Sequence, residues 1–193
     1  MEDVTLTPKN VISTFTGLDF NVVEPKESDI KIEDIAHALS LMCRANGHFN
    51  QFYSVAQHSM SCCKEAKARG LSKEIQLCCL LHDASEAYLC DIPRPIKDEA
   101  YKKREEALEK VIFKALAPQV YDLFFEEHSP WIEIDDVMLY WEFETFFKTK
   151  EKRNPIPKSQ NINIELRKQV VPFDVVRTEF LMMYNELVRG MKN

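Results

Sequence analysis

The sequence has few glycines, which build tight turns, and it has no long apolar run of the kind that spans a membrane. Only four glycines occur among 193 residues, whereas charged residues make up 29%. A β-sandwich needs more turn glycine, so this composition favours helices. No run of 18 apolar residues exists, and the N-terminal Met1-Glu2-Asp3 is acidic. We therefore expect no membrane span, no signal peptide and a cytoplasmic location.

The sequence also lacks a CxxC motif and clusters of basic residues. No CxxC occurs among the six cysteines, which are Cys43, Cys62, Cys63, Cys78, Cys79 and Cys90. This pattern indicates reduced thiols in a cytosolic protein rather than a disulfide framework or a zinc knuckle. The net charge is −6, without a basic stripe, which argues against duplex nucleic acid as a partner.

The length and the 45% hydrophobic content predict one domain with a single core. Residues 1–32 contain Pro8 and Pro25 and have no helical pattern, so we expect an N-terminal arm packed on the domain. Within this arm, residues 15–20 are expected to form a short hairpin or an extended lip. Residues 33–193 are expected to form the helical domain itself.

Apolar periodicity and capping residues predict an all-α bundle of six or seven helices. Ser54 and Ser72 are expected N-caps, and Gly70 ends a helix between them, so the two flanking helices should be antiparallel. Residues 150–171 are polar and are expected to form a loop. The predicted helices cover approximately residues 33–44, 55–69, 73–88, 98–116, a short stretch to 127, 131–149 and 173–189.

The most informative feature is the dipeptide His82-Asp83, within an apolar run that should form a buried helix. Burying an imidazole and a carboxylate is costly unless a partner offsets their desolvation. A divalent metal is such a partner, because these groups are common metal ligands. His58 lies 24 residues upstream, and Asp135 and Asp136 lie downstream, each in a predicted helix. Either aspartate is a candidate for the fourth ligand.

Several segments carry a resemblance to HD-domain phosphohydrolases, and in particular to the subfamily that includes bacterial and phage 5′-deoxynucleotidases. These segments are Asp34–Ser40 (DIAHALS), Tyr53–Ser59 (YSVAQHS), Leu81–Glu86 (LHDASE) and Asp91–Pro93 (DIP). The resemblance implies an HD-type helical bundle. Proteins of this size in the family are often homodimers or higher homo-oligomers.

The resemblance also implies one divalent transition metal, bound by His58, His82, Asp83 and Asp135. Asp135 is preferred over Asp136 because the family pattern places a glutamate seven residues later, which fits Glu142. The nitrogen and oxygen ligands admit Mn, Fe, Co, Ni or Zn. Four protein ligands leave coordination positions open for water and substrate.

Two carboxylates are candidate catalytic residues. Glu86 follows Asp83 by three residues, so helical spacing places it on the ligand face, where it could activate water. Its alternative roles are a surface residue or a partner of a ligand histidine. Asp91 matches an aspartate that assists catalysis and contacts the sugar in the similar deoxynucleotidases. Its alternative role is simply to form a turn before Ile92-Pro93.

Three residues are candidates for substrate binding. Arg44, at the end of the first predicted helix, suits a phosphate, although an arginine there also complements the helix dipole. Similar deoxynucleotidases have a tryptophan after this arginine that helps to exclude ribose, but this chain has Ala45. Lys97 is a weaker phosphate candidate. His37 is a core histidine, a helper near the phosphate or a surface residue.

The leading hypothesis is therefore a metal-dependent 5′-deoxynucleotidase that releases phosphate from deoxyribonucleoside monophosphates. The same family resemblance leaves a deoxynucleoside triphosphate triphosphohydrolase as the alternative enzyme. A non-catalytic, metal-dependent nucleotide-binding protein is the alternative of another class. In each case the expected partner is a small-molecule nucleotide.

Overall fold

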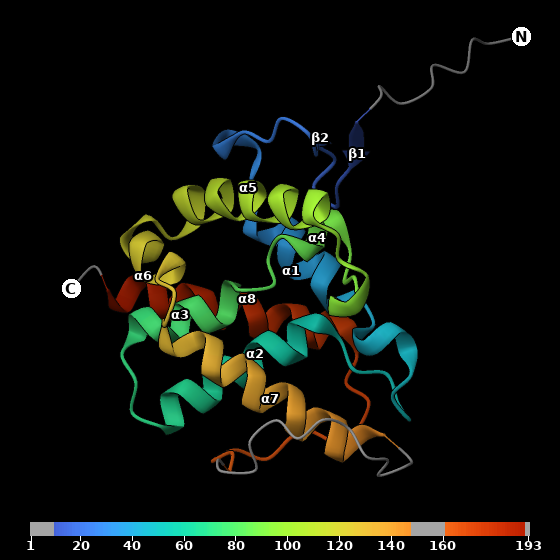
Figure 1. Cartoon of the computed structure of the whole chain (residues 1–193), viewed down its shortest axis with the longest axis vertical. Coiled ribbons are helices and arrows are strands. Elements are labelled where there is room, and N and C mark those ends of the chain that lie inside the picture. The colour runs from blue at the N-terminus through green and yellow to red at the C-terminus, as the bar shows by residue number, and fades with distance from the viewer. Residues whose placement is uncertain (1–9, 148–160, 192–193) are drawn as a thin grey trace, which may run out of the picture.

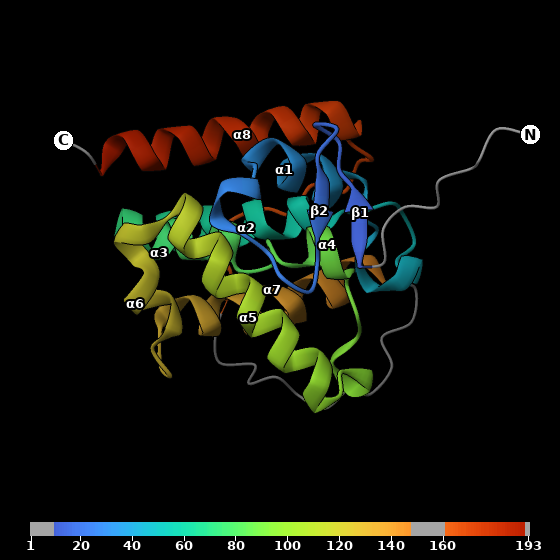
Figure 2. The same cartoon turned by 90° about the horizontal axis from the view of Figure 1, so that it is seen from above.

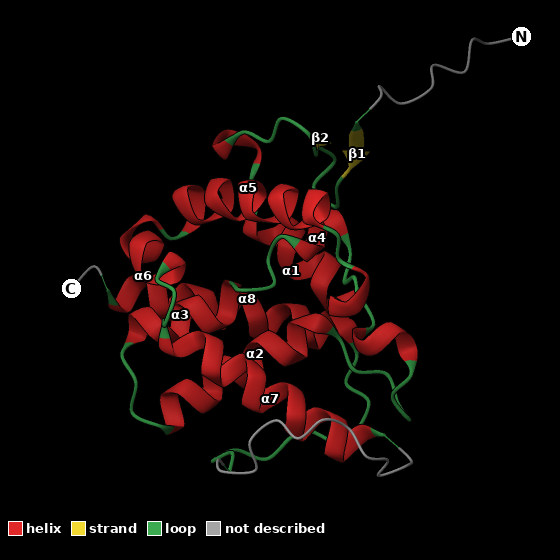
Figure 3. Ribbon diagram, viewed as in Figure 1, coloured by secondary structure: helices red, strands yellow, loops and turns green. Residues whose placement is uncertain are grey.

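A computed structural model describes residues 10–147 and 161–191, and these residues are mostly helical (Figure 1, Figure 3). Across the described residues, two short helices, α4 (Glu86–Leu89) and α6 (Tyr121–Phe125), accompany six helices of nine or more residues. The predicted all-α fold is confirmed. The longer helices are α1 (Ile32–Leu41), α2 (Val55–Ala68), α3 (Lys73–Leu81), α5 (Glu99–Leu116), α7 (Pro130–Phe146) and α8 (Phe173–Gly190).

The α2–α3 hairpin forms the centre of the bundle. Ser54 is the N-cap of α2 and forms a capping box. The Gln57 N–H donates to the Ser54 hydroxyl, and the Ser54 N–H donates to the Gln57 side-chain oxygen. Gly70 turns the chain with φ +72°, a conformation that glycine adopts without a steric penalty. Helices α1 and α8 pack together, α8 also contacts α2 and α3, and α7 contacts α2 and α3. Figure 2 shows α8 along one edge of the molecule.

The core follows the predicted apolar faces. Leu77, Leu80 and Leu81 of α3 are fully buried, as are Ile35 and Leu39 of α1. Burial of these side chains is the main favourable term that holds α3 inside the bundle. Part of the N-terminal arm joins this core through an antiparallel hairpin of β1 (Val11–Ser13) and β2 (Asp19–Asn21). Its Phe20 is fully buried and stacks on Tyr88.

Three predicted helices end earlier than expected, and one of them, the helix predicted over 131–149, ends at Phe146 because Phe147 is extended. Helix α1 ends at Leu41 rather than at Arg44, because the following backbone pairs with the segment before α2. Arg44 N–H donates to Tyr53 C=O at 2.9 Å, and Cys43 forms a β-bridge with Ser54. Arg44–Gly47 then forms a tight turn in which the last three residues have positive φ. The helix predicted over 73–88 ends at Leu81, and the turn that follows leads into α4.

Some predictions fall on residues outside the described part of the chain. These are the first nine residues of the arm, the last two residues of the helix predicted over 131–149, and the loop at 150–160. Within the described ranges, no helix combines the length and the apolar character needed to cross a bilayer.

Candidate metal centre

The His82-Asp83 pair lies where α3 ends, not within a continuous helix. His82 is the C-cap of α3, and its Nδ1 lies 2.8 Å from Cys79 C=O. In an unbroken helix this carbonyl would accept from the Asp83 N–H. Instead, Ala84 N–H bonds back to Leu81 C=O and Glu86 N–H to Asp83 C=O, which is tighter, three-residue spacing. The turn directs both side chains toward α2 and α7.

Four predicted ligand residues meet at one point. His58 Nε2 of α2 lies 3.1 Å from His82 Nε2 and 3.0 Å from Asp135 Oδ1 of α7. Asp83 Oδ2 lies 3.6 Å from His58 Nε2 and 3.4 Å from His82 Nε2. Nitrogen and oxygen atoms that bind one metal at ~2.1 Å stand roughly 3.0 to 3.4 Å apart. Three of these four distances fall in that range and the fourth is slightly longer, so the spacing is close to that around a single transition-metal ion.

The hydrogen bonds of the two histidines support the same conclusion. His58 Nδ1 lies 2.9 Å from Glu142 Oε1, and His82 Nδ1 faces the Cys79 carbonyl. Each of these acceptors fixes the ring proton on Nδ1 and leaves a lone pair on Nε2. The two Nε2 lone pairs then face each other beside two carboxylate oxygens. Such a set of acceptors needs a cation between them.

The electrostatics of the cluster favour positive charge. Burial lowers the pKa of His82, but the Asp83 and Asp135 carboxylates outweigh it and hold that pKa above its usual value. Burial raises the pKa of Asp135, yet hydrogen bonds with His58 and His82 hold it well below its usual value. Either a proton or a metal ion satisfies this environment, and the two compete for the same lone pairs.

Cys62 adds a sulfur atom to the cluster. It lies one turn after His58 on α2, is fully buried, and has its Sγ 3.6 Å from His58 Nε2. The donor atoms of His58, Cys62, His82 and Asp135 all lie within 4.8 Å of one another. Burial raises the pKa of the Cys62 thiol to about 11, so the free thiol is neutral near pH 7.

Arg44 is buried beside the cluster. Its Nε donates to Glu142 Oε2 at 2.9 Å, and its Nη1 lies 3.5 Å from Asp83 Oδ2. Glu142 is itself completely buried, so one carboxylate holds both Arg44 and His58 in place. This pairing directs the two terminal nitrogens of Arg44 toward the metal ligands.

A cavity of about 540 Å³ opens onto the cluster, within the range of small-molecule sites. Glu86 and Asp91, the two predicted catalytic residues, both line it. Glu86 is 5% exposed, and its Oε2 has no hydrogen-bond partner among the described residues. Burial, with repulsion from Asp83 and Asp91, raises the pKa of Glu86 well above its usual value. Burial likewise raises the pKa of Asp91.

The loop between α4 and α5 contributes two cations to the cavity. Lys97, a predicted phosphate ligand, lines it with its ammonium 2.7 Å from Glu105 of α5. Arg94 spans the gap to α7, with Nη2 2.7 Å from Asp135 Oδ2 and Nη1 2.9 Å from Asp136 Oδ1. Asp135 thus faces the cluster, whereas Asp136 contacts Arg94 alone among these groups. Trp131, 5.6 Å from the His82 ring, forms part of the cavity wall.

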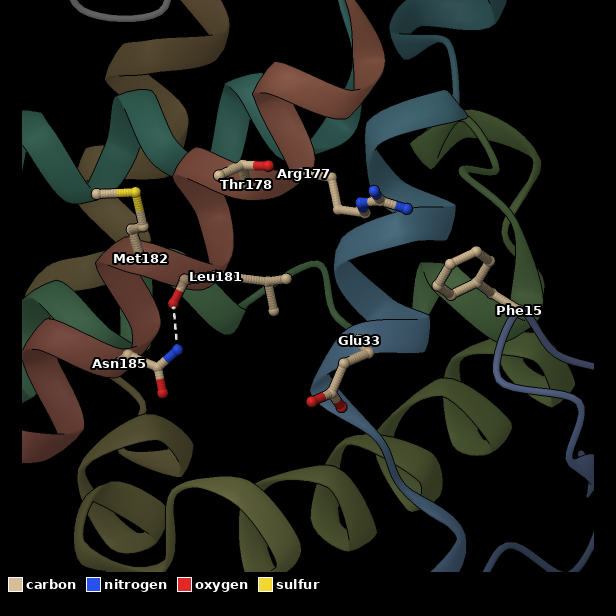
Figure 4. Close-up of a pocket in the computed structure, with 7 residues that line it drawn as sticks. All are labelled: Phe15, Glu33, Arg177, Thr178, Leu181, Met182 and Asn185. Atoms are coloured by element: carbon tan, nitrogen blue, oxygen red, sulfur yellow. Dashed lines mark hydrogen bonds between the residues drawn. The ribbon is translucent and has the colours of Figure 1, made fainter.

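His37 is not brought to this cavity. Its ring stacks on Phe15 of the hairpin loop with centroids 3.9 Å apart, and its Nδ1 lies 3.4 Å from Arg177 Nη1 of α8. Phe15 and Arg177 border a separate pocket of about 340 Å³ between α1 and α8 (Figure 4). The geometry therefore gives no support to a phosphate contact for His37.

Sequence reasoning missed three residues around the cluster. Cys62 could have been found from its four-residue spacing after His58. Arg94 stands between two prolines in the predicted loop, which marks a rigid position for a cation. Trp131, at the start of α7, precedes Asp135 by one helical turn, so it lies on the same face.

Comparison with known proteins agrees with this geometry. A model of the HD domain matches residues 47–154, which include all four clustered ligand residues. The chain is 43% identical to the uncharacterized protein YfdR of Escherichia coli K12 over 103 residues, which is 52% of this chain and 55% of that protein. It is 40% identical to an uncharacterized protein of Rhodobacter capsulatus over 87 residues, which is 42% of this chain and 44% of that protein.

The chain thus spans about half the length of the curated relatives it matches. The HD-domain model, by contrast, matches more than half of this chain, and the matched residues include those that form the cluster. The chain therefore belongs to the HD-domain superfamily.

Proposed function

We propose that the protein is a 5′-deoxynucleotidase that releases phosphate from deoxyribonucleoside 5′-monophosphates. The observation that carries this proposal is that His58, His82, Asp83 and Asp135 meet at one point, beside a cavity lined by the last three of them and by Arg44. A divalent metal at this point would polarise the phosphoryl group and offset its charge. The remaining steps depend on side chains of the chain itself.

Arg44 is the proposed phosphate ligand. Glu142 fixes its Nε, so Nη1 and Nη2 are held toward the metal ligands. A planar guanidinium can donate two hydrogen bonds to adjacent phosphate oxygens, and this geometry orients the phosphorus for attack. Lys97 is the second proposed cation, reaching the cavity from the loop before α5.

Glu86 is the proposed general base. Its side chain lines the cavity, its Oε2 has no hydrogen-bond partner among the described residues, and a carboxyl whose pKa is raised by burial can accept a proton from an attacking water. Asp91 lines the same cavity and is proposed to hold the sugar or to assist the leaving oxygen. Trp131 and Phe143 offer aromatic walls for the nucleoside.

The charge of the cavity favours a monophosphate over a triphosphate. Three cations and six carboxylates line it, and each cation already has a carboxylate within 4 Å. A bound divalent metal would therefore leave little excess positive charge for a polyphosphate chain. The free Glu86 side chain at the cluster, in turn, favours an enzyme over a non-catalytic nucleotide-binding protein.

A substrate panel tests the proposal. Purified protein with added Mn²⁺, Co²⁺ or Mg²⁺ is incubated with deoxy- and ribonucleoside mono- and triphosphates, and the products are identified. We expect inorganic phosphate and a nucleoside from deoxynucleoside monophosphates, and loss of this activity in Asp83→Ala. Triphosphate release from deoxynucleoside triphosphates would contradict the proposal, as would full activity of Asp83→Ala. Ribonucleotides are included because Ala45 replaces the expected ribose-excluding tryptophan.

A further inference from the structure

Arg94 is the cavity cation to which the proposed mechanism gives no role. Arg94 is the first residue of a short turn (Arg94–Ile96) and lies between Pro93 and Pro95. The rings of these two prolines limit movement of its backbone. Its side chain crosses from this loop to α7 and is 63% exposed. An exposed side chain on a fixed backbone can change partners without disturbing the fold.

The two carboxylates that bind Arg94 differ in their surroundings. Nη2 lies 2.7 Å from Asp135 Oδ2, and the Asp135 side chain is 15% exposed, with its other oxygen at the histidine cluster. Nη1 lies 2.9 Å from Asp136 Oδ1, and that side chain is 46% exposed. The pair with Asp135 is a partly buried, charge-assisted contact, whereas an exposed pair such as that with Asp136 contributes little. The Asp136 contact is therefore the one that is easily exchanged.

Asp135 stands between two guanidinium groups. Arg44 Nη2 lies 4.0 Å from Asp135 Oδ1, and Arg94 Nη2 binds Oδ2 of the same carboxylate. A phosphate held at the cluster would thus have an arginine on either side. The fork of Arg94 suits a tetrahedral oxyanion as well as it suits a pair of carboxylates.

We propose that Arg94 is a second phosphate-binding residue, which keeps Nη2 on Asp135 and exchanges Asp136 for a phosphate oxygen at Nη1. In this arrangement Asp136 occupies the anion position when no phosphate is bound. The ligand is a phosphate monoester or inorganic phosphate, and the inference rests on the proposed phosphohydrolase function. It predicts that Arg94 and Asp136 affect phosphate binding in opposite directions.

Calorimetric titration of Mn²⁺-loaded protein with inorganic phosphate measures this directly. Arg94→Met should weaken phosphate binding by about tenfold or more, as expected for loss of a charge-assisted hydrogen bond. Asp136→Asn should tighten it by roughly two- to threefold, because the competing carboxylate is gone. Arg94→Lys, which keeps the charge but not the fork, should fall between wild type and Arg94→Met.

Arg167→Met is the matched control, because Arg167 is also an exposed arginine paired with a glutamate, Glu179, but does not line the cavity. Its phosphate affinity should equal that of wild type. The Mn²⁺ content of every variant is measured, so that phosphate binding is compared at equal loading. Loss of Mn²⁺ from Arg94→Met would instead indicate a role in holding Asp135 and would overturn the exchange.

Unchanged phosphate affinity in Arg94→Met, weaker binding in Asp136→Asn, or no phosphate binding by loaded wild type would also overturn the proposal. The result is independent of nucleotide turnover. If phosphate binding follows the predicted pattern but no nucleotide is hydrolysed, the proposed function fails and the role of Arg94 stands. If deoxynucleoside monophosphates are hydrolysed but phosphate binding does not follow this pattern, the proposed function stands and the role of Arg94 fails.

Discussion

Arg44 and Glu142 form a buried pair in which the arginine Nε donates to Glu142 Oε2 at 2.9 Å. The other oxygen of the same carboxylate lies 2.9 Å from His58 Nδ1. One glutamate on α7 therefore orients both a proposed phosphate ligand and a proposed metal ligand. This relationship couples the two halves of the site, because neither side chain can rotate without losing a buried partner.

Replacing this glutamate should weaken metal binding although Glu142 itself does not face the metal. We expect Glu142→Gln to lower metal affinity by roughly 10- to 100-fold, the usual cost of losing a partner of a ligand histidine. Competition between the protein and a chromophoric chelator for Co²⁺ measures the affinity. Glu144→Gln is the control, because Glu144 lies on the same helix but is exposed. Equal affinity in Glu142→Gln and wild type would contradict the orienting role.

Metal removal should lower stability as well as activity. Without a cation, two imidazole lone pairs and two carboxylate oxygens face one another in a largely buried site. A ligand that binds only the folded state at 100 times its Kd adds about 2.7 kcal/mol to the free energy of unfolding. We expect dialysis against a chelator to lower Tm, and Mn²⁺ or Co²⁺ to restore it. Asp83→Ala should show a smaller rise in Tm, whereas an unchanged wild-type Tm would argue against a metal centre here.

The dyad could be singled out from the sequence because its chemistry conflicts with its surroundings, whereas the choice of Asp135 over Asp136 came from the family resemblance. A histidine and an aspartate in an apolar run require a partner, and His58 and Asp135 lie on helices that a short turn and a long connection can bring together. The position of the dyad at a helix end was not predictable. It depends on a local contact between the His82 ring and the Cys79 carbonyl, three residues earlier, which the spacing of apolar residues does not indicate.

Cys62 and Arg94 escaped prediction for different physical reasons. A buried cysteine behaves as a small apolar side chain, so Cys62 has the same pattern as the core cysteines Cys78 and Cys79. Arg94 lies in a loop, where the direction of a side chain depends on the local backbone angles. In a helix that direction follows from the 3.6-residue period and can be read from the sequence. His37 was a candidate that the structure does not bring to the site. Its segment resembles the family, but its ring stacks on Phe15 outside the cavity.

Cys90 occupies a strained backbone position next to Asp91. Its φ of 71° and ψ of 155° lie in a region that is open to glycine and costs other residues of order 1–3 kcal/mol. Tyr101 Oη of α5 bonds to Leu89 C=O at 3.2 Å and to Cys90 C=O at 2.9 Å, which holds this segment in place. The strain fixes where the chain leaves α4 and thus where Asp91 enters the cavity.

Cys90→Gly should therefore stabilise the fold. We expect a net gain of about 1 kcal/mol in the free energy of unfolding, because relief of strain exceeds the entropy that glycine adds to the unfolded chain. Urea denaturation measures the change. Cys90→Ala, which removes the thiol but keeps the Cβ, should show no such gain. If both variants gained equally, the thiol rather than the backbone would be the cause.

Glu109 should make the metal-free protein less stable as pH rises. Burial, followed by repulsion from Glu105 and Asp83, raises its pKa from 4.5 to about 7. Because the folded pKa lies above the unfolded value, the unfolded state ionises first, and stability falls between about pH 4.5 and pH 7. Glu109→Gln should consequently raise the free energy of unfolding more at pH 8 than at pH 4.5, by of order 1–3 kcal/mol. Glu106→Gln, an exposed change on the same helix, is the control, and urea denaturation of metal-free protein at both pH values measures the difference. An equal effect of Glu109→Gln at the two pH values would show that its carboxyl ionises at its ordinary pKa in the folded protein.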